Sequence, residues 1–177
     1  MTRASPPKAA LLTGVTGQRW ATIARPAKAL RRQSLSLPAY DGGAGFLVDT
    51  NLWIDCMDPA SPWHAWAVDQ RQSCSERAPL HVNLVIYTEL LVPEPAVDAL
   101  DALLDVYETQ RGAWPWSCAA LAARAFGQYR RRSGLRHAAL PHFFIGAHAA
   151  VSNLAVLTRD PKPNRSHFPR LELVSAP

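Results

Sequence analysis

Short apolar runs alternate, from residue 46 onward, with stretches in which apolar residues recur at helical spacing. The runs predict five strands, at residues 46–49, 80–83, 113–116, 154–158 and 171–174. The helical patterns predict helices at residues 61–77, 84–91, 95–108, 117–132 and 141–153. Strands that alternate with helices indicate an α/β fold with a parallel sheet covered on both faces.

Residues typical of helix starts support these boundaries. Ser61 stands before Pro62, which predicts a cap followed by proline in the first turn. Ser117 is a second predicted cap, and Pro141 begins the helix that leads into residues 154–158.

Acidic residues follow three of the apolar runs. Asp49 ends the run Phe-Leu-Val-Asp-Thr-Asn, Asp160 ends Leu-Ala-Val-Leu-Thr-Arg-Asp, and Glu89 follows Val-Asn-Leu-Val-Ile-Tyr-Thr. Ligands of open α/β folds bind at the carboxyl ends of the strands. Two carboxylates about 5 Å apart at an effective dielectric of ~20 repel by roughly 3 kcal/mol. Three of them together therefore predict a divalent-metal site, and a metal-dependent phosphodiesterase is a natural use of such a site.

Residues 1–45 differ from the remainder in charge. They carry seven Lys or Arg and one acidic residue. Residues 46–177 carry twelve Lys or Arg and thirteen Asp or Glu. Three interpretations stay open: a disordered basic arm that contacts nucleic acid, an organellar transit peptide, or a segment upstream of the native start. We favour the last interpretation and expect a basic leader at residues 1–45 followed by one domain at 46–177.

The three cysteines, Cys56, Cys74 and Cys118, form no C-x-x-C pair. Their number and spacing predict buried thiols in a reducing compartment and argue against a disulfide framework or a thiolate zinc site. No stretch has the roughly 18 apolar residues that a membrane span needs. We therefore expect a cytoplasmic protein without a membrane partner.

Four blocks in their order along the chain carry a family resemblance. They are Val-Asp-Thr-Asn at 48–51, Ile-Tyr-Thr-Glu-Leu at 86–90, Pro-His-Phe-Phe-Ile-Gly-Ala-His-Ala at 141–149 and Leu-Thr-Arg-Asp at 157–160. This set resembles the PIN-domain family, and most closely the VapC-type toxins of bacterial toxin–antitoxin pairs. The run Phe-Pro-Arg-Leu-Glu-Leu-Val at 168–174 resembles the last strand of these toxins.

The resemblance implies a three-layer α/β/α fold around a mostly parallel five-stranded sheet. It also implies an endoribonuclease that depends on Mg²⁺ or Mn²⁺, is controlled by a small cognate antitoxin protein and forms a homodimer. The metal ligands of the family correspond here to Asp49, Glu89 and Asp160. The polar groups expected to help bind the metal are Thr50, Asn51 and Thr158.

His142 departs from the family pattern, because the family has an acidic residue at this position. A neutral imidazole suits Mn²⁺ and other transition metals better than Mg²⁺. His142 can also exchange a proton near neutral pH, so we include it among the candidate catalytic residues. Three outcomes stay open: an active enzyme with a shifted metal preference, a weakened enzyme, and compensation by another carboxylate.

Two further groups of residues have both a structural and a functional interpretation. The arginines 124, 130, 131, 132 and 136 either stabilise a helix C-terminus or contact RNA phosphates. The tryptophans 53, 63 and 66 either pack in the core or contact a partner. A catalytically weakened PIN-like module that binds RNA or a protein is the alternative function, and a 5′ nuclease acting on DNA is a third.

Overall fold

The computed structural model describes residues 43–93, 96–133 and 140–176. Most of the predicted leader and Arg136 lie outside these ranges, and the division of the chain at residue 45 stays a prediction. The elements are β1 (Phe46–Val48), α2 (Thr50–Met57), α3 (His64–Ser75), β2 (Leu80–Val82), α4 (Leu84–Leu91), α5 (Val97–Val106), β3 (Gln110–Arg111), α6 (Trp116–Ser133), α7 (Leu140–Ser152), β4 (Ala155–Thr158), α8 (Lys162–His167) and β5 (Leu173–Ser175).

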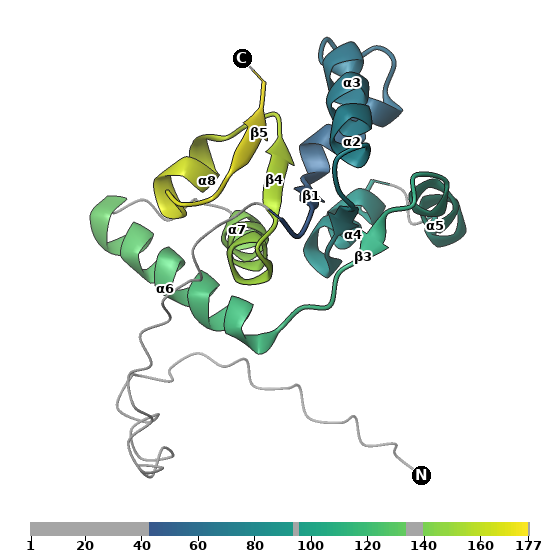
Figure 1. The fold of residues 1–177 in the computed structure, drawn as a ribbon. Helices are drawn as coiled ribbons and strands as arrows, with labels where there is room; N and C mark the ends of the chain where they lie inside the picture. Colours follow the sequence, from purple (N-terminus) through teal and green to yellow (C-terminus); the bar gives the residue numbers. More distant parts are fainter. Residues whose placement is uncertain (1–42, 94–95, 134–139, 177) are drawn as a thin grey trace, which may run out of the picture. The chain divides into compact units, whose positions relative to one another are not determined.

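The sheet has five strands in the order β3-β2-β1-β4-β5, and every pair is parallel. Its central strand β1 is fully buried, as expected for a strand covered on both faces. Right-handed crossovers in this order place α2–α5 over one face and α6–α8 over the other. Figure 1 shows these two groups of helices on opposite sides of the strands. The predicted three-layer α/β/α fold is confirmed.

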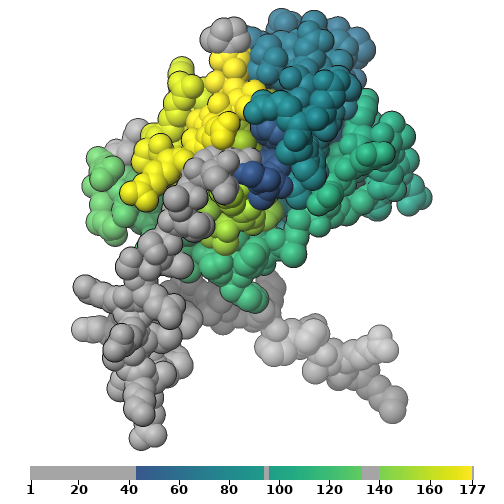
Figure 2. All heavy atoms as spheres, in the orientation of Figure 1, coloured from purple at the N-terminus to yellow at the C-terminus, as the bar shows by residue number. Residues whose placement is uncertain are grey.

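Two apolar clusters hold the layers together. The larger one joins the sheet to α2–α5 and to the end of α7, and its largest fully buried side chain is Trp53. The smaller one joins α6, α7 and α8 through small alanines and the rings of Phe143 and Phe168. The space-filling view in Figure 2 shows the early helices on one flank and α8 with the end of α6 on the other. Among the described helices, none is long and apolar enough to cross a membrane.

Three parts of the fold differ from the sequence prediction. Helices α2 and α8 were not predicted; the six residues of α8 are too few for a clear periodic pattern. Strand β3 lies at 110–111, so the prediction of a strand at 113–116 is wrong. Two predicted helix starts are also wrong. Helix α6 already begins at Trp116, so Ser117 lies inside the first turn and does not precede it. Helix α3 begins at His64 after Trp63, so Ser61 is not its cap and Pro62 is not in its first turn.

The turn before β1 requires a glycine. Gly45 has a φ of +127°, which L side chains rarely adopt. A Cβ at this position would also meet the carbonyl oxygen of Pro79 and the ring of His81. The start of β1, and therefore the position of Asp49 four residues later, depends on this close approach.

A second close approach joins α7 to the α8 region. A Cβ added to Gly146 would overlap the ring of Phe168 and come within 2.9 Å of the Asn164 Oδ1. By contrast, a Cβ on Gly127 of α6 would meet only the guanidinium of Arg131 at 3.6 Å.

These two helical glycines give a matched pair of stability predictions. Gly146→Ala should lower the free energy of unfolding by about 1–3 kcal/mol, because the methyl group overpacks the contact with Phe168. Gly127→Ala should raise it by roughly 0.5–1 kcal/mol, because alanine has less backbone entropy to lose in a helix. Denaturant unfolding measures both values, and equal effects of the two substitutions would contradict this packing.

Candidate active site

Asp49 stands at the end of β1 and caps α2. Its side chain is almost fully buried, with a relative exposure of 4%. One carboxylate oxygen, Oδ1, accepts the backbone N–H of Thr50 at 2.9 Å. The other, Oδ2, accepts the Thr158 hydroxyl at 2.6 Å and the Asn51 amide at 2.9 Å. The β1 strand end is therefore tied to the adjacent β4 strand end through one carboxylate.

Burial raises the pKa of Asp49 above its ordinary value, and the nearby Glu89 carboxylate adds to this effect. The hydrogen bonds from Thr158 and Thr50 and the proximity of His142 oppose it, but burial is the largest influence. The ionised Asp49 consequently costs stability. This cost grows as the pH rises from the ordinary aspartate pKa through the raised one, because only the folded state keeps the proton in that window.

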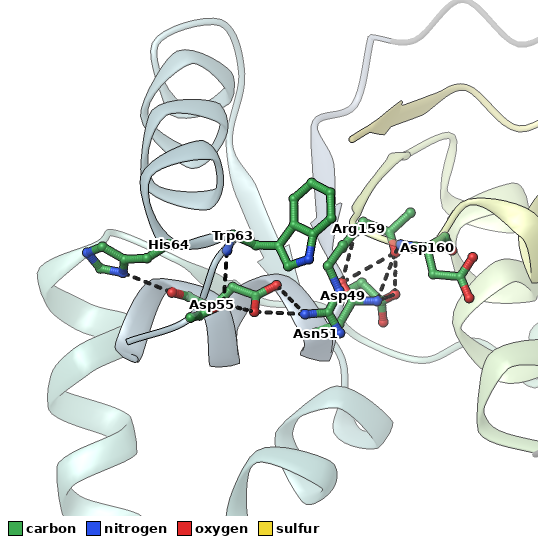
Figure 3. Close-up of polar contacts among 9 residues, drawn as sticks. Asp49, Asn51, Asp55, Trp63, His64, Arg159 and Asp160 are labelled. Carbon is green, nitrogen blue, oxygen red and sulfur yellow. Dashed lines mark hydrogen bonds and ion pairs between the residues drawn. The ribbon is translucent and has the colours of Figure 1, made fainter. Parts of the chain in front are cut away.

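Asn51 and Thr158 complete the connection between the two strand ends. The Asn51 Oδ1 accepts the backbone N–H of Arg159 at 3.0 Å, and its Nδ2 lies 3.1 Å from the Thr158 hydroxyl. Thr158 is fully buried and also lies 3.2 Å from the backbone nitrogen of Asp160. Both residues belong to the expected polar set, and both form hydrogen bonds with Asp49. Figure 3 shows Asn51 beside Asp49.

Glu89 comes from α4, whose start is fixed by the cap Asn83 after β2. Its Oε2 accepts the hydroxyl of Thr50 at 2.5 Å. Because Thr50 directly follows Asp49, this hydrogen bond brings the α4 carboxylate to the same sheet edge. Thr50 therefore links two of the predicted ligands.

His142 lies in the first turn of α7 and is exposed. Its charge lowers the pKa of Asp49, so the start of α7 lies close enough to the carboxyl end of β1 for the two groups to interact electrostatically. That His142 takes part in the site stays a prediction.

Asp160 lies at the margin of this group. It is exposed, and its Oδ1 accepts the backbone N–H of Lys162 at 3.1 Å, which starts α8. In Figure 3 its carboxylate stands beside the network around Asp49 and not inside it. Within residues 43–93, 96–133 and 140–176, no three His, Cys, Asp or Glu side chains are placed to hold a metal ion together.

The chemistry of the donors nevertheless fits a hard divalent cation. Carboxylate and hydroxyl oxygens are the ligands that Mg²⁺ prefers, and it commonly binds through only one or two carboxylates with several waters. Burial and the Glu89 charge both destabilise the ionised form of Asp49, and a cation would offset both effects. Asp49 and Glu89 are the two carboxylates that the structure brings closest to this requirement.

Sequence reasoning missed an ion pair next to the site. Asp55 is buried in α2, and its carboxylate oxygens lie 2.8 and 2.9 Å from one guanidinium nitrogen of Arg159. The Ser61 hydroxyl donates to the same carboxylate at 2.7 Å, and Figure 3 shows Arg159 between Asp55 and the Asp49 network. An acidic residue within the otherwise apolar run at residues 52–56 was the available signal.

A buried histidine supports the α4 start and was also missed in this role. The Asn83 Nδ2 lies 3.2 Å from the His148 Nδ1, while the Asn83 Oδ1 accepts two backbone N–H groups of α4. Burial lowers the pKa of His148, so the ring is neutral at pH 7 and its Nδ1 accepts from Asn83. His148 thus helps to orient the helix that carries Glu89.

No protein-family model matches the chain, and no curated protein matches it. Solved structures do. VapBC2 from Rickettsia felis bound to a promoter DNA fragment matches with a TM-score of 0.59 at 14% identity, over 75% of this chain and 98% of that one. VapBC-1 from nontypeable Haemophilus influenzae matches with a TM-score of 0.54 at 18% identity, over 73% and 96%.

A third similar structure is Mycobacterium tuberculosis VapC20, described as a sarcin–ricin loop cleaving toxin. It matches with a TM-score of 0.52 at 16% identity, over 72% of this chain and 99% of that one. At such identities the likeness establishes the fold. The chain has the PIN-like fold of the VapC toxins, as the four sequence blocks predicted.

The ion pair next to the site gives a prediction about stability. Arg159→Ala should lower the free energy of unfolding by about 1–3 kcal/mol, because it leaves the Asp55 charge buried with less compensation. The half-exposed position of Arg159 keeps the value below that of a fully buried pair. Chemical denaturation measures it, with Arg165→Ala on the exposed surface of α8 as the control. A loss no larger than that of the control would contradict a structural role for the pair.

Proposed function

We propose that this protein is a metal-dependent endoribonuclease and the toxin of a type II toxin–antitoxin pair. The observation that carries the proposal is the buried Asp49 carboxylate, whose pKa is raised and which shares one sheet edge with Glu89 and His142. A buried carboxylate with a perturbed pKa beside other titratable groups is typical of a functional site.

Mg²⁺ or Mn²⁺ is the proposed cofactor, with Asp49 and Glu89 as its direct ligands and Asp160, at the margin of the group, as a ligand through water. When bound, the metal would supply Lewis-acid activation for phosphodiester hydrolysis. The chain's own groups would prepare this site. Thr158 and Asn51 fix the Asp49 carboxylate, and Thr50 fixes Glu89. Exposed His142 is placed to exchange a proton with the substrate or solvent.

The structural neighbours support RNA as substrate and an antitoxin as partner. VapC20 is described as cleaving the sarcin–ricin loop, and the VapBC structures are toxin–antitoxin complexes. For this chain both assignments are proposals, as is the homodimer that the family resemblance implies.

An apolar groove suits the antitoxin. A pocket of about 300 Å³ between α2, α4 and α5 is lined only by apolar side chains, which are Met57, Leu90, Leu91, Ala96, Ala99, Leu100 and Leu103. Exposed Ile54 lies one turn before Met57 on α2. We assign this groove to an apolar segment of the antitoxin. Trp53, one of the tryptophans considered for this role, is instead buried against Tyr107, with ring centroids 5.9 Å apart.

The alternative function is a catalytically weakened PIN-like module that binds RNA or a protein. His142 favours it, because an imidazole in place of a carboxylate removes one negative charge from the site. The hydrogen bonds of Asp49 with Thr158 and of Glu89 with Thr50 favour the enzyme, because they fix both carboxylates at one edge of the sheet.

Asp49→Asn tests the proposed site. The wild-type protein should melt at a higher temperature in Mg²⁺ or Mn²⁺, because a cation that binds only the folded state stabilises it. It should also cleave RNA. In Asp49→Asn the metal-dependent shift should disappear, and the cleavage rate should fall at least about 100-fold, the scale of losing one electrostatic group at a reacting centre.

Asp69→Asn is the control, because Asp69 is exposed on α3 and is not part of the hydrogen-bond network around Asp49. It should behave as wild type in both measurements. A wild-type protein that neither cleaves RNA nor gains thermal stability with either metal would overturn the proposed enzyme and favour the binding module.

His142→Asp separates the three outcomes left open for this residue. We expect higher RNA cleavage in Mg²⁺ than for wild type, because a carboxylate restores a hard oxygen donor. The ratio of the rates in Mn²⁺ and Mg²⁺ should fall accordingly. Single-turnover cleavage in each metal measures this ratio. Unchanged rates in both metals would show that His142 takes no part in the chemistry.

A further inference from the structure

The sequence from residue 46 divides into two regions of opposite charge. Residues 46–108 contain eleven acids and only two Lys or Arg. Residues 109–171 contain ten Lys or Arg and one acid, Asp160. The second region includes α6, α7 and α8, which together have no acidic side chain. The near-neutral total charge therefore conceals a basic side built from α6–α8.

A polar pocket lies within this basic side. It has a volume of about 260 Å³ and lies between the last turns of α6 and the end of α8. Figure 2 shows these two segments on the same flank. The lining residues are Ala125, Gln128, Tyr129, Arg132, Ser166 and His167, and none of them is acidic.

The lining offers several hydrogen-bond donors that no described residue uses. Arg132 forms no ion pair with any carboxylate of the described ranges. Gln128, Tyr129 and His167 contribute an amide, a phenol and an imidazole N–H. The Ser166 hydroxyl already donates to the Pro163 carbonyl at 3.0 Å, so its proton is not available to a ligand. A guanidinium with neutral donors and no carboxylate suits an oxyanion.

Ring contacts hold the imidazole of this pocket in place. The centroid of the His167 ring lies 4.5 Å from that of Phe143 and 5.2 Å from that of Tyr129. Burial and the positive charge of Arg132 lower the pKa of His167. A bound anion would oppose the effect of Arg132 and so favour the charged form of His167.

Two segments of the chain lead from the pocket to the candidate active site. Phe143, which packs on His167, follows His142 in α7, and the charge of His142 lowers the pKa of Asp49. On the other side, α8 runs from just after Asp160 to His167, a rise of about 9 Å for its six residues. A nucleic acid strand that crosses the active site would have a neighbouring phosphate within reach of this pocket.

We propose that the pocket of Gln128, Tyr129, Arg132 and His167 binds a backbone phosphodiester of the RNA substrate, beside the bond to be cut. The inference rests on the proposed function and adds a subsite to it. Arg132 supplies the charge, and its planar fork binds two phosphate oxygens. Such contacts carry no base information, so the subsite would set the register of the strand and leave sequence choice to other groups.

The test compares RNA binding by wild type, Arg132→Gln, Arg132→Lys and Arg124→Gln. Binding of a short single-stranded RNA is measured over a range of salt concentrations in a chelator, so that no cleavage takes place. Arg132→Gln should bind roughly tenfold more weakly, the scale of one charge-assisted contact. Its slope of log K against log salt should be shallower by about 0.7, the value for one phosphate of a single strand.

The other two variants separate a built subsite from general positive charge. Arg124→Gln removes a charge from the exposed surface of the same helix outside the pocket and should change affinity less than twofold. Arg132→Lys should keep the salt slope but lose about threefold in affinity, because a lysine cannot bind two oxygens with a fork. Thermal melting should be the same for all four proteins.

Three results would overturn the subsite. They are equal RNA affinity of Arg132→Gln and Arg124→Gln, absence of RNA binding by wild type, and a loss in Arg132→Gln that appears with duplex DNA of the same sequence but not with RNA. Cleavage of RNA by wild type in Mg²⁺ or Mn²⁺ is scored separately. Binding that depends on Arg132 without any cleavage would support the subsite and contradict the proposed nuclease.

Discussion

One buried carboxylate determines how the centre of this molecule is arranged. Asp49 caps α2, accepts the Thr158 hydroxyl from the next strand and is almost fully buried. Burial alone makes its charge unfavourable, and the hydrogen bonds only reduce that cost. A bound cation would offset the cost of the charge that the hydrogen bonds leave. The buried carboxylate that joins β1 to β4 therefore also favours the binding of a cation at this edge of the sheet.

Contacts next to the candidate site both stabilise the fold and position the site residues. The Arg159 side chain neutralises Asp55 of α2, while its backbone N–H donates to Asn51 beside Asp49. His148 orients Asn83, which caps the helix that carries Glu89. Substitutions at these residues would change the site without touching substrate, so their effects on stability need to be measured together with activity.

The sequence predicted the parallel sheet and the strand ends at which Asp49 and the Asn83 cap of the Glu89 helix lie, because strand ends and the residues after them are local features. It did not predict α2, nor α8, whose six residues are too few for a periodic signal. The Asp55–Arg159 pair was missed because its members are 104 residues apart. The sequence alone shows that residues 46–108 are acidic and residues 109–171 are basic. Only the fold shows that α6 and α8 together line one pocket in the basic region.

The pKa of Asp49, measured by NMR from its carboxyl carbon shift, tests the central claim most directly. In metal-free protein we predict a pKa of Asp49 above the ordinary aspartate value, and a fall of this pKa when Mg²⁺ is added. An ordinary pKa of Asp49 without metal would contradict this prediction, because its burial would then create no demand for a cation.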